Sequence, residues 1–367
     1  SHDHLDYHKN FKNYLRAKLY LFKNLIKERG VIVSDRSIPE FKEIKKIAFN
    51  KKLKLYSILD DKNNFKILSH SFLGESQFLK IKYKNHTLNI KLNLIGKIQL
   101  KNVLMSIIAA NNHNLNLSKI LNIIPKLKPL EGRLEKIGKI KNKSKVILDY
   151  AHTPEALKVC LLNLREQFPN KKLILLFGCG GNRDQNKRSK MGKIACTYSD
   201  KIYLTDDNPR YENPKKIRGE VKKGIKKTKV IEISNRARAI RESIKDLKTG
   251  NILLVAGKGH EKSQDFGDKK IYFSDRKIIL DEIRIKNKNL SNSFRINVIK
   301  EVSGKKKLPM SLNFKSARID SRDILNNDIF FAIKGKKNDG NKFVAQSFKK
   351  KASLAIVNKI QNKLKID

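Results

Sequence analysis

Apolar residues near the start of the chain recur at helical spacing. Over residues 11–27 they stand at Phe11, Leu15, Leu19 and Phe22, three or four positions apart, which predicts an amphipathic helix. The run Val-Ile-Val that follows at 31–33 predicts a short strand.

A different period follows. Residues 53–95 alternate apolar and polar positions, which predicts antiparallel strands. Residues 101–112 carry apolar positions at helical spacing and predict a buried helix. Pro125 and Pro129 mark a linker after that helix, so a first domain is expected over residues 1–128.

A second block, residues 129–287, alternates short apolar runs with helical segments. A helix is expected at 154–167, because Thr153 is a capping residue and Pro154 fits the first helical turn. The apolar runs lie at 146–148, 173–177, 202–204, 230–233 and 252–256. This alternation predicts an α/β fold with a Rossmann-like, doubly wound parallel sheet.

The last block, residues 288–367, follows a stretch rich in asparagine and lysine at 286–292 that we interpret as a linker. It has the pattern of a small α/β unit and ends soon after a predicted strand at 354–357. We therefore expect a truncated domain here.

Four of the five predicted strands of the second block run into a polar cluster; the clusters begin at 149, 178, 206 and 257. Parallel strands bring their carboxyl ends to one edge of a sheet, so the clusters are expected to form one site. They supply arginine forks and glycine-rich backbone, which suit an anionic ligand. Taken alone, each cluster also fits an ordinary turn, and His152 or His260 alone fits a structural histidine. Their joint occurrence favours a site.

Phosphate-binding signatures are missing from the sequence. The chain contains no G-x-G-x-x-G fingerprint and no G-x-x-x-x-G-K-[ST] phosphate loop.

The formal net charge of +47 suggests a polyanion as partner. Lysine is spread along the chain together with asparagine and isoleucine, however, and these residues share A/T-rich codons. We favour codon bias over nucleic-acid binding, which stays open as an alternative.

The cysteines and the hydropathy bear on location. The three cysteines lack metal-site spacing, and no segment reaches the roughly 18–20 apolar residues of a membrane helix. We expect a reduced, cytoplasmic protein without membrane insertion.

At this point the motifs resemble the Mur ligase family. The resemblance covers roughly residues 1–285 and rests on segments in the family's order and spacing: 1–8, 131–133, 149–154, 177–184, 187–188, 206–210, 257–261 and 274–276. It implies that 1–128 is part of the central ATP-binding domain without its phosphate loop, and that 129–287 is the C-terminal, amino-acid-binding domain. Residues 288–367 resemble, over a shorter stretch, the N-terminal domain of the member that adds D-alanyl-D-alanine, which implies a fused second ligase in the same chain.

The resemblance also implies a reaction. It indicates an ATP-dependent ligase of peptidoglycan precursor synthesis that adds meso-diaminopimelate to UDP-N-acetylmuramoyl-L-alanyl-D-glutamate through an acyl phosphate. ATP and Mg²⁺ are the implied cofactors, because cations must screen the repulsion between carboxylate and nucleotide.

The implied roles divide into three sets. His4 and Lys18, the latter carbamylated, are implied as magnesium ligands, and partial burial would help Lys18 to react with carbon dioxide. The implied ATP contacts are Asn102, Arg133 and Asp149, with His152 as a further catalytic candidate. The implied diaminopimelate pocket consists of Arg183, Asp207, Asn208, Pro209, Arg210, Gly257 and Glu261.

Some alternatives stay open. A lysine-adding member of the family is one, although lysine would leave Arg210 without a carboxylate to pair. Folylpolyglutamate synthetase is another, and the loop at 206–210 argues against it. The sequence departs from the family at 33–36 and at 97–99, near the expected nucleotide. Because the phosphate loop is expected before Ser1, this chain alone is expected not to turn over ATP.

Overall fold

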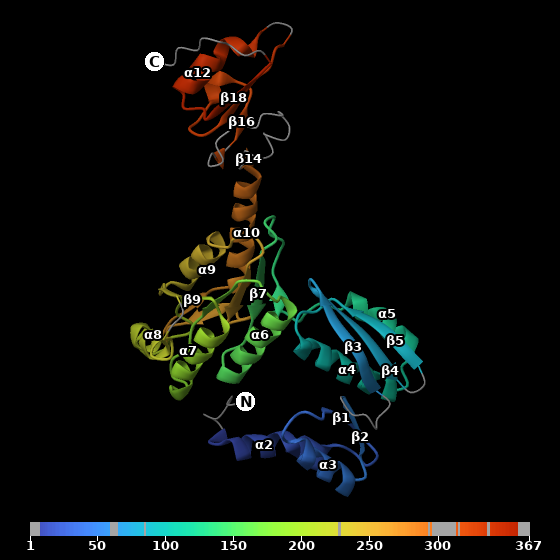
Figure 1. Ribbon diagram of the computed structural model, residues 1–367. Helices are drawn as coiled ribbons and strands as arrows, with labels where there is room; N and C mark the ends of the chain where they lie inside the picture. Colours follow the sequence, from blue (N-terminus) through green and yellow to red (C-terminus); the bar gives the residue numbers. More distant parts are fainter. Residues whose placement is uncertain are drawn as a thin grey trace. The chain divides into compact units, whose positions relative to one another are not determined.

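The computed structural model describes residues 8–58, 65–83, 86–226, 229–292, 294–295, 313–314, 316–335 and 338–358. It divides into two compact units. The first contains Ser1–Lys139 and Lys143–Asp281, and the second contains Ile140–Asn142 and Glu282–Asp367 (Figure 1). Among the described residues, no helix is both long and apolar enough to cross a membrane.

The chain begins in the first unit with a helix. Helix α2 (Phe11–Tyr20) continues into a π-helical turn (Leu21–Leu25), which confirms most of the helix expected at 11–27. Strand β1 (Val31–Asp35) and helix α3 (Phe41–Asn50) follow. The antiparallel arrangement expected from residue 53 onwards is wrong for β2 (Lys54–Ile58), which pairs with β1 in parallel because α3 forms a crossover between them.

The three strands that follow confirm the alternating pattern. Strands β3 (Phe65–Leu73), β4 (Ser76–Tyr83) and β5 (His86–Leu92) form an antiparallel sheet in which β4 buries every second side chain. Helices α4 (Lys97–Asn112) and α5 (Leu117–Ile123), with a short 3-10 turn (Ile124–Lys126), pack against this sheet through a shared apolar core.

A six-stranded sheet forms the centre of the rest of the first unit. Its order is β10-β9-β8-β11-β7-β6, and all pairs are parallel except the edge pair of β6 with β7. The strands are β6 (Glu135–Lys136), β7 (Lys145–Asp149), β8 (Leu173–Phe177), β9 (Lys201–Leu204), β10 (Lys229–Glu232) and β11 (Ile252–Ala256). This confirms the predicted doubly wound α/β fold.

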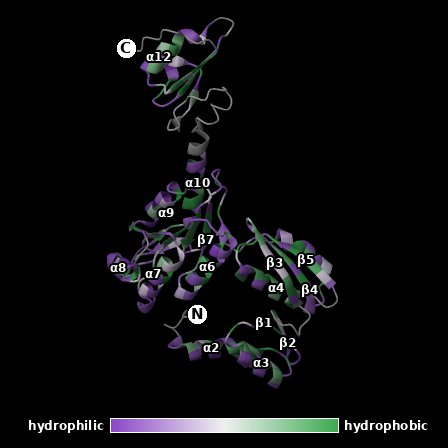
Figure 2. Cartoon of the chain, in the orientation of Figure 1, coloured by the Kyte–Doolittle hydropathy of each residue, from purple (hydrophilic) through white to green (hydrophobic). Residues whose placement is uncertain are grey.

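Helices connect these strands and cover the sheet. They are α6 (Pro154–Gln167), α7 (Asn186–Tyr198), α8 (Pro214–Lys222) and α9 (Arg236–Lys245). Thr153 caps α6 as expected, since its hydroxyl accepts from the Ala156 amide. Figure 2 shows hydrophobic colour on the buried strand β7 and hydrophilic colour on α8, so the apolar runs predicted as strands form the core.

The linker expected at 286–292 is wrong. Helix α10 (Asp275–Asn292) runs through this stretch. Lysine and asparagine cost a helix far less than glycine or proline, and neither breaker occurs at 286–292.

The second unit contains a small parallel sheet. Strands β16 (Ala317–Arg318), β17 (Ile329–Ala332) and β18 (Leu354–Val357) pair in parallel, and helix α12 (Val344–Lys349) packs against them through Val344. The short strands β14 (Phe294–Arg295) and β15 (Asn313–Phe314) form a separate antiparallel pair. An α/β unit was expected here; its assignment to a second ligase stays a prediction.

Strand β11 offers a test of the core. Leu254 is fully buried at the centre of the sheet, so Leu254→Ala is expected to lower the free energy of unfolding by about 2–5 kcal/mol. Leu162→Ala, at a half-exposed position of α6, is the control and should cost less than about 0.5 kcal/mol. Equal effects in a urea titration would contradict the placement of β11 in the core.

Candidate functional site

The carboxyl ends of four strands meet at one rim of the six-stranded sheet. The Gly257 amide donates to the Asp149 carbonyl at 3.1 Å and thereby joins the ends of β11 and β7. The Gly181 amide donates to the Asn208 carbonyl at 2.9 Å and joins the loops after β8 and β9. The structure therefore brings together the four polar clusters that the sequence singled out.

Close backbone packing holds the loops after β8 and β9 together. A Cβ atom at Gly181 would lie 1.9 Å from the Pro209 carbonyl oxygen, so no side chain fits there. Gly257 has φ +115°, a conformation that other residues rarely adopt. Its α-carbon faces the Asp207 carboxylate, because an added Cβ would lie 2.8 Å from Asp207 Oδ2.

A polar cluster of Asn208, Lys258 and Glu261 lies at this rim. Lys258 Nζ donates to Asn208 Oδ1 and to Glu261 Oε2, each at 2.8 Å. Asn208 Nδ2 donates to the same Glu261 oxygen at 3.1 Å. Burial would raise the pKa of Glu261, but the hydrogen bond and charge of Lys258, with help from Asn208 and Tyr150, hold that pKa below its ordinary value. Glu261 is therefore an anion at neutral pH.

Arg210 lies next to this cluster. Its Nη1 donates to the Gly181 carbonyl at 2.6 Å, and its Nε lies 3.5 Å from Asp265 Oδ2. Asp265 belongs to the hairpin of β12 (Ser263–Asp265) and β13 (Lys270–Tyr272), and its amide donates to Asn208 Oδ1 at 3.1 Å. The side chain of Arg210 remains about one quarter exposed, so it can still meet a ligand.

Arg183 lies on the neighbouring loop. Asn182, the residue before it, accepts a hydrogen bond from the Tyr211 amide at 3.1 Å, which holds this loop beside Arg210. The side chain of Arg183 is exposed. The structure thus places the backbones of the two predicted arginine positions in adjacent loops.

Asp207 and Pro209 contribute to the rim in another way. Asp207 is buried; its Oδ1 accepts from the Asn208 amide at 2.8 Å, and its Oδ2 lies 3.9 Å from Arg236 Nη1. Arg236 is itself fully buried and paired with Asp275 at 2.7 Å. The Asp207 carboxylate thus faces the protein interior. Pro209 contributes through its backbone, since its carbonyl accepts from the Glu212 amide at 3.1 Å.

A second feature is a cavity of about 530 Å³ beside the end of β7. Asn102, Arg133, Asp149 and His152 all line it, so the structure gathers the three residues predicted for the nucleotide and the catalytic candidate His152. The cavity has the size of an ordinary small-molecule site.

Asp149 lies deep in this cavity. Its Oδ2 accepts from the Leu134 amide at 2.7 Å, and its Oδ1 accepts from the Ala151 amide at 2.8 Å and from the Cys160 thiol at 3.2 Å. Burial raises the pKa of Asp149, although these bonds and Arg133 act in the opposite direction. Burial, reinforced by Asp149, also raises the pKa of the Cys160 thiol well above its ordinary value, so the thiol acts as a donor.

Aromatic residues form the outer edge of the same cavity. The Arg133 guanidinium lies 4.8 Å from the centre of the Tyr150 ring, within cation–π range. The Tyr150 ring also contacts His152 and His260, at centroid distances of 4.6 and 5.2 Å. Tyr150 further touches the Asn208 cluster, because its hydroxyl lies 3.4 Å from Glu261 Oε1.

The predicted magnesium ligands lie elsewhere in the chain. His4 lies outside the described residues. The partial burial expected for Lys18 is wrong: Lys18 is exposed, since α2 turns Leu19 toward the core, and its Nζ lies 5.5 Å from the centre of the Tyr14 ring. The described part of the chain contains no group of three His, Cys, Asp or Glu residues that could hold a metal ion.

Three buried cations near the rim were not predicted as functional residues. Arg188 is fully buried and binds Glu212 at 2.8 Å and Glu220 at 2.7 Å, and Arg236 and Lys258 are buried as described above. The one sequence signal for Lys258 was its place between two glycines after an apolar run.

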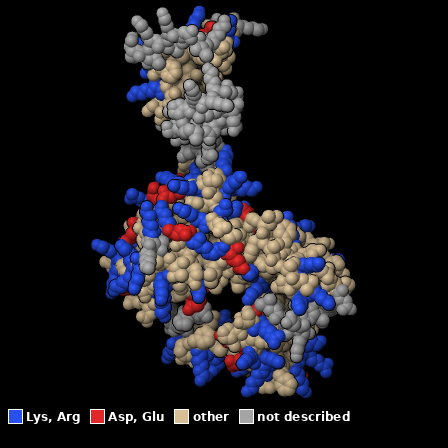
Figure 3. Space-filling model, in the orientation of Figure 1, with Lys and Arg blue, Asp and Glu red and all other residues tan. Residues whose placement is uncertain are grey.

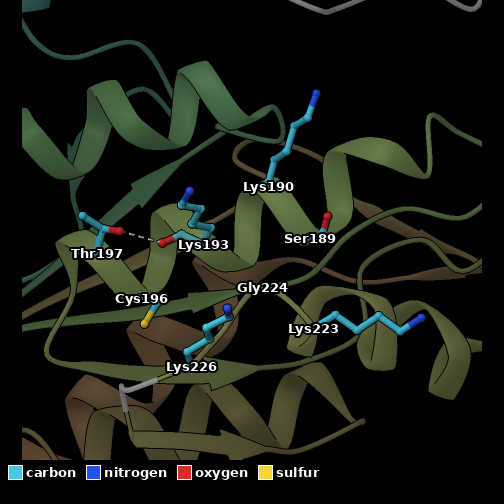
Figure 4. Close-up of a pocket in the computed structure, with 8 residues that line it drawn as sticks. All are labelled: Ser189, Lys190, Lys193, Cys196, Thr197, Lys223, Gly224 and Lys226. Carbon is cyan, nitrogen blue, oxygen red and sulfur yellow. Dashed lines mark hydrogen bonds between the residues drawn. The ribbon is translucent and has the colours of Figure 1, made fainter.

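The structure also has a lysine-lined cavity of about 540 Å³ formed by α7 and the segment after α8. Figure 4 shows Lys190 and Lys223 directed away from Cys196 and Gly224, so the ammonium groups do not converge. Figure 3 shows lysine and arginine spread over the visible face of the molecule. This distribution agrees with a general excess of lysine.

Comparison with known proteins places this fold and rim in one family. Residues 1–110 match the Mur ligase middle domain, and residues 132–259 match the Mur ligase glutamate ligase domain. These two parts of the chain therefore belong to the Mur ligase family.

Relatives with known names agree with this result. The UDP-N-acetylmuramoyl-L-alanyl-D-glutamate–2,6-diaminopimelate ligase of Rickettsia bellii is 40% identical over 279 residues, which are 76% of this chain and 58% of that protein. A solved structure of a ligase with the same name is 29% identical, with a TM-score of 0.55 over 78% of this chain and 59% of that one.

A more distant structure shares the fold alone. The MurF ligase of Thermotoga maritima, solved in complex with ADP, is 16% identical, with a TM-score of 0.55 over 77% of this chain and 58% of that one. This chain thus spans somewhat less than two thirds of the length of the proteins that it matches.

The packing of the rim loops can be tested with two glycines. Gly181→Ala is expected to lower the free energy of unfolding by about 1–3 kcal/mol, because the new methyl group would overlap the Pro209 carbonyl. Gly219→Ala is the matched control. Gly219 lies exposed in α8 with nothing within 4 Å of an added Cβ, so this substitution should raise the free energy of unfolding by about 0.5–1 kcal/mol. Thermal unfolding measures both, and a neutral Gly181→Ala would contradict the close approach of the loops.

Proposed function

We propose that this chain is part of an ATP-dependent ligase that adds meso-diaminopimelate to UDP-N-acetylmuramoyl-L-alanyl-D-glutamate in peptidoglycan precursor synthesis. The observation that carries the proposal is the rim, where the partly exposed side chain of Arg210 lies beside Asp265 and the anionic carboxylate of Glu261 binds Asn208, which in turn accepts from the Asp265 amide. A cation and an anion in one site suit a zwitterionic amino acid. The names of the relatives support the same substrate.

Diaminopimelate fits the rim better than lysine does. Both amino acids carry an ammonium group for Glu261. Only diaminopimelate carries a second carboxylate, and a guanidinium pairs with a carboxylate through two parallel hydrogen bonds. With lysine, Arg210 would stay without that partner, which is how a polar site rejects a close analogue.

The cavity beside β7 is the proposed nucleotide site. Arg133, Asp149 and Asn102 would contact ATP, with Asn102 contributing an amide from the middle domain. His152 is the further catalytic candidate in the same cavity. In the proposed reaction, the glutamate carboxylate attacks the γ-phosphate of ATP, and ADP leaves as an acyl phosphate forms. The amine of diaminopimelate then displaces phosphate to give the amide.

The metal part of the proposal rests on resemblance. Lys18, as a carbamate, and His4 are proposed as magnesium ligands, and magnesium would supply charge neutralisation at the phosphates.

The second unit is proposed as the beginning of a ligase that adds D-alanyl-D-alanine. Its support is the shorter resemblance at 320–322, 330–335 and 338–340. The Asp320 side chain, which accepts from the Arg322 amide at 2.9 Å, begins a 3-10 turn there.

The amino-acid site can be tested by binding alone. We expect the 367-residue chain to bind meso-diaminopimelate in isothermal titration calorimetry, and to bind L-lysine more weakly. Arg210→Asn is expected to weaken diaminopimelate binding about tenfold or more and to leave lysine binding within about threefold, because only diaminopimelate loses an ion pair. Asparagine is chosen because it tolerates the φ of 51° at this position.

Arg241→Asn, an exposed arginine on α9, is the control and should change neither affinity. Equal losses for both amino acids in Arg210→Asn would show that Arg210 does not recognise the second carboxylate. A wild-type chain that binds neither amino acid would overturn the proposed substrate.

A further inference from the structure

Lys258 stands out among the many lysines. Among the lysines whose burial the structure describes, it is the one that is buried, with no exposed surface, whereas the others lie at intermediate or exposed positions. Burying an ammonium group costs several kcal/mol unless it is paired and hydrogen-bonded. Its two partners, Asn208 and Glu261, belong to the rim at which diaminopimelate is proposed to bind.

The first consequence concerns the amide of Asn208. Its Oδ1 accepts from Lys258 Nζ at 2.8 Å and from the Asp265 amide at 3.1 Å. A flipped amide would point its NH₂ group at two donors, so this network fixes the orientation. Nδ2 is therefore directed toward Glu261 and available as a donor.

The second consequence concerns the carboxylate of Glu261. Lys258 and Asn208 both bind Oε2, whereas Oε1 has the longer 3.4 Å contact with the Tyr150 hydroxyl. The side chain of Glu261 is about 30% exposed. One oxygen is thus anchored inside the protein, and the other is the better placed acceptor for a ligand.

We infer that Lys258 is a positioning residue: its buried ammonium fixes Glu261 directly and also fixes Asn208, whose NH₂ group donates to the same carboxylate, so that the oriented Glu261 carboxylate recognises the ammonium group of an amino acid. This inference rests on the proposed function for the identity of the ligand. Lys258 itself does not touch the substrate; it acts through its two partners.

Charged groups on several elements face Glu261. Lys258 follows the same strand, Tyr150 comes from the end of β7, and the charge of Arg236 on α9 also reaches it. His260 is adjacent in the chain and packs on Tyr150. Arg236 is committed to Asp275 at 2.7 Å, which leaves Lys258 as the cation directly bound to Glu261.

The test uses Lys258→Met, which keeps most of the length of the side chain and removes its charge. In wild type, the pKa of Glu261 is held below its ordinary value, so diaminopimelate affinity should be flat between pH 8 and pH 5.5. In the variant, burial is no longer offset by Lys258, the pKa of Glu261 rises, and protons compete with the ligand as the pH falls. We expect calorimetry to show about tenfold weaker binding at pH 8 and a further loss toward pH 5.5.

Two controls separate positioning from a loss of structure. Lys262→Met, an exposed lysine four residues further on, should bind diaminopimelate as wild type does. Lys258→Met in a Glu261→Gln background, where no carboxylate titrates, should add little to the loss caused by Glu261→Gln and should show no pH dependence. If Lys258 had a purely structural role, the losses of diaminopimelate affinity caused by Lys258→Met and by Glu261→Gln would multiply in the double variant. The affinity would then also be independent of pH in every variant.

A ligand-free measurement keeps the inference separate from the substrate. The titration of the Glu261 carboxyl, followed by ¹³C NMR in wild type and Lys258→Met, should move to higher pH in the variant. If wild type fails to bind diaminopimelate while this shift is present, the proposed substrate fails and the positioning role stands. If the titration does not move, or if Lys258→Met binds diaminopimelate as wild type does at all pH values, the inference is overturned.

Discussion

The insertion of β11 between β7 and β8 is the constraint on which the whole rim depends. The chain adds β8, β9 and β10 on one side of β7 and then returns to place β11 in the position left between β7 and β8. Every one of these pairings is parallel, so the loop after β11 emerges between the loops after its two neighbours. For this reason Glu261 reaches Tyr150 at the end of β7 on one side. On the other side Glu261 and Lys258 reach Asn208, in the loop after β9 that packs on the loop after β8. A strand order without this return would separate the same residues.

Much of this arrangement could be predicted from the sequence. The five apolar runs of the second block became the five parallel strands, and the capping pair Thr153 and Pro154 marked the start of α6 at the right residue. Buried strands are continuous apolar runs and caps are local, so both are visible in a single sequence. The convergence of the clusters followed from the fold class alone.

Other features depend on contacts that a local pattern does not contain. The parallel pairing of β2 was missed, because a strand's own alternation does not say which strand lies beside it. The inward direction of Asp207 depends on Arg236, which comes almost thirty residues later, and on Asp275 behind it. The burial of Lys258 was hidden by the abundance of exposed lysines. In each case the deciding partner is distant in sequence.

Three arginines of the first unit make ion pairs at buried positions. Arg188, Arg218 and Arg236 each bind carboxylates at buried positions of the C-terminal sheet and its helices. A guanidinium presents several donors in a fixed plane and so satisfies two partners at once. Figure 3 shows lysine and arginine over the visible surface, whereas these three arginines contact the loops that form the rim.

The backbone conformation of Arg210 lowers the stability of the loop that carries this residue at the rim. Arg210 has φ 51°, in the left-handed region, where a residue with a Cβ atom is disfavoured by about 1–2 kcal/mol. Glycine would relieve that strain and make a more stable loop, but it would remove the guanidinium from the rim. Thermostability and ligand recognition therefore pull this position in opposite directions, and an engineer who selected variants on melting temperature alone would tend to lose the arginine first.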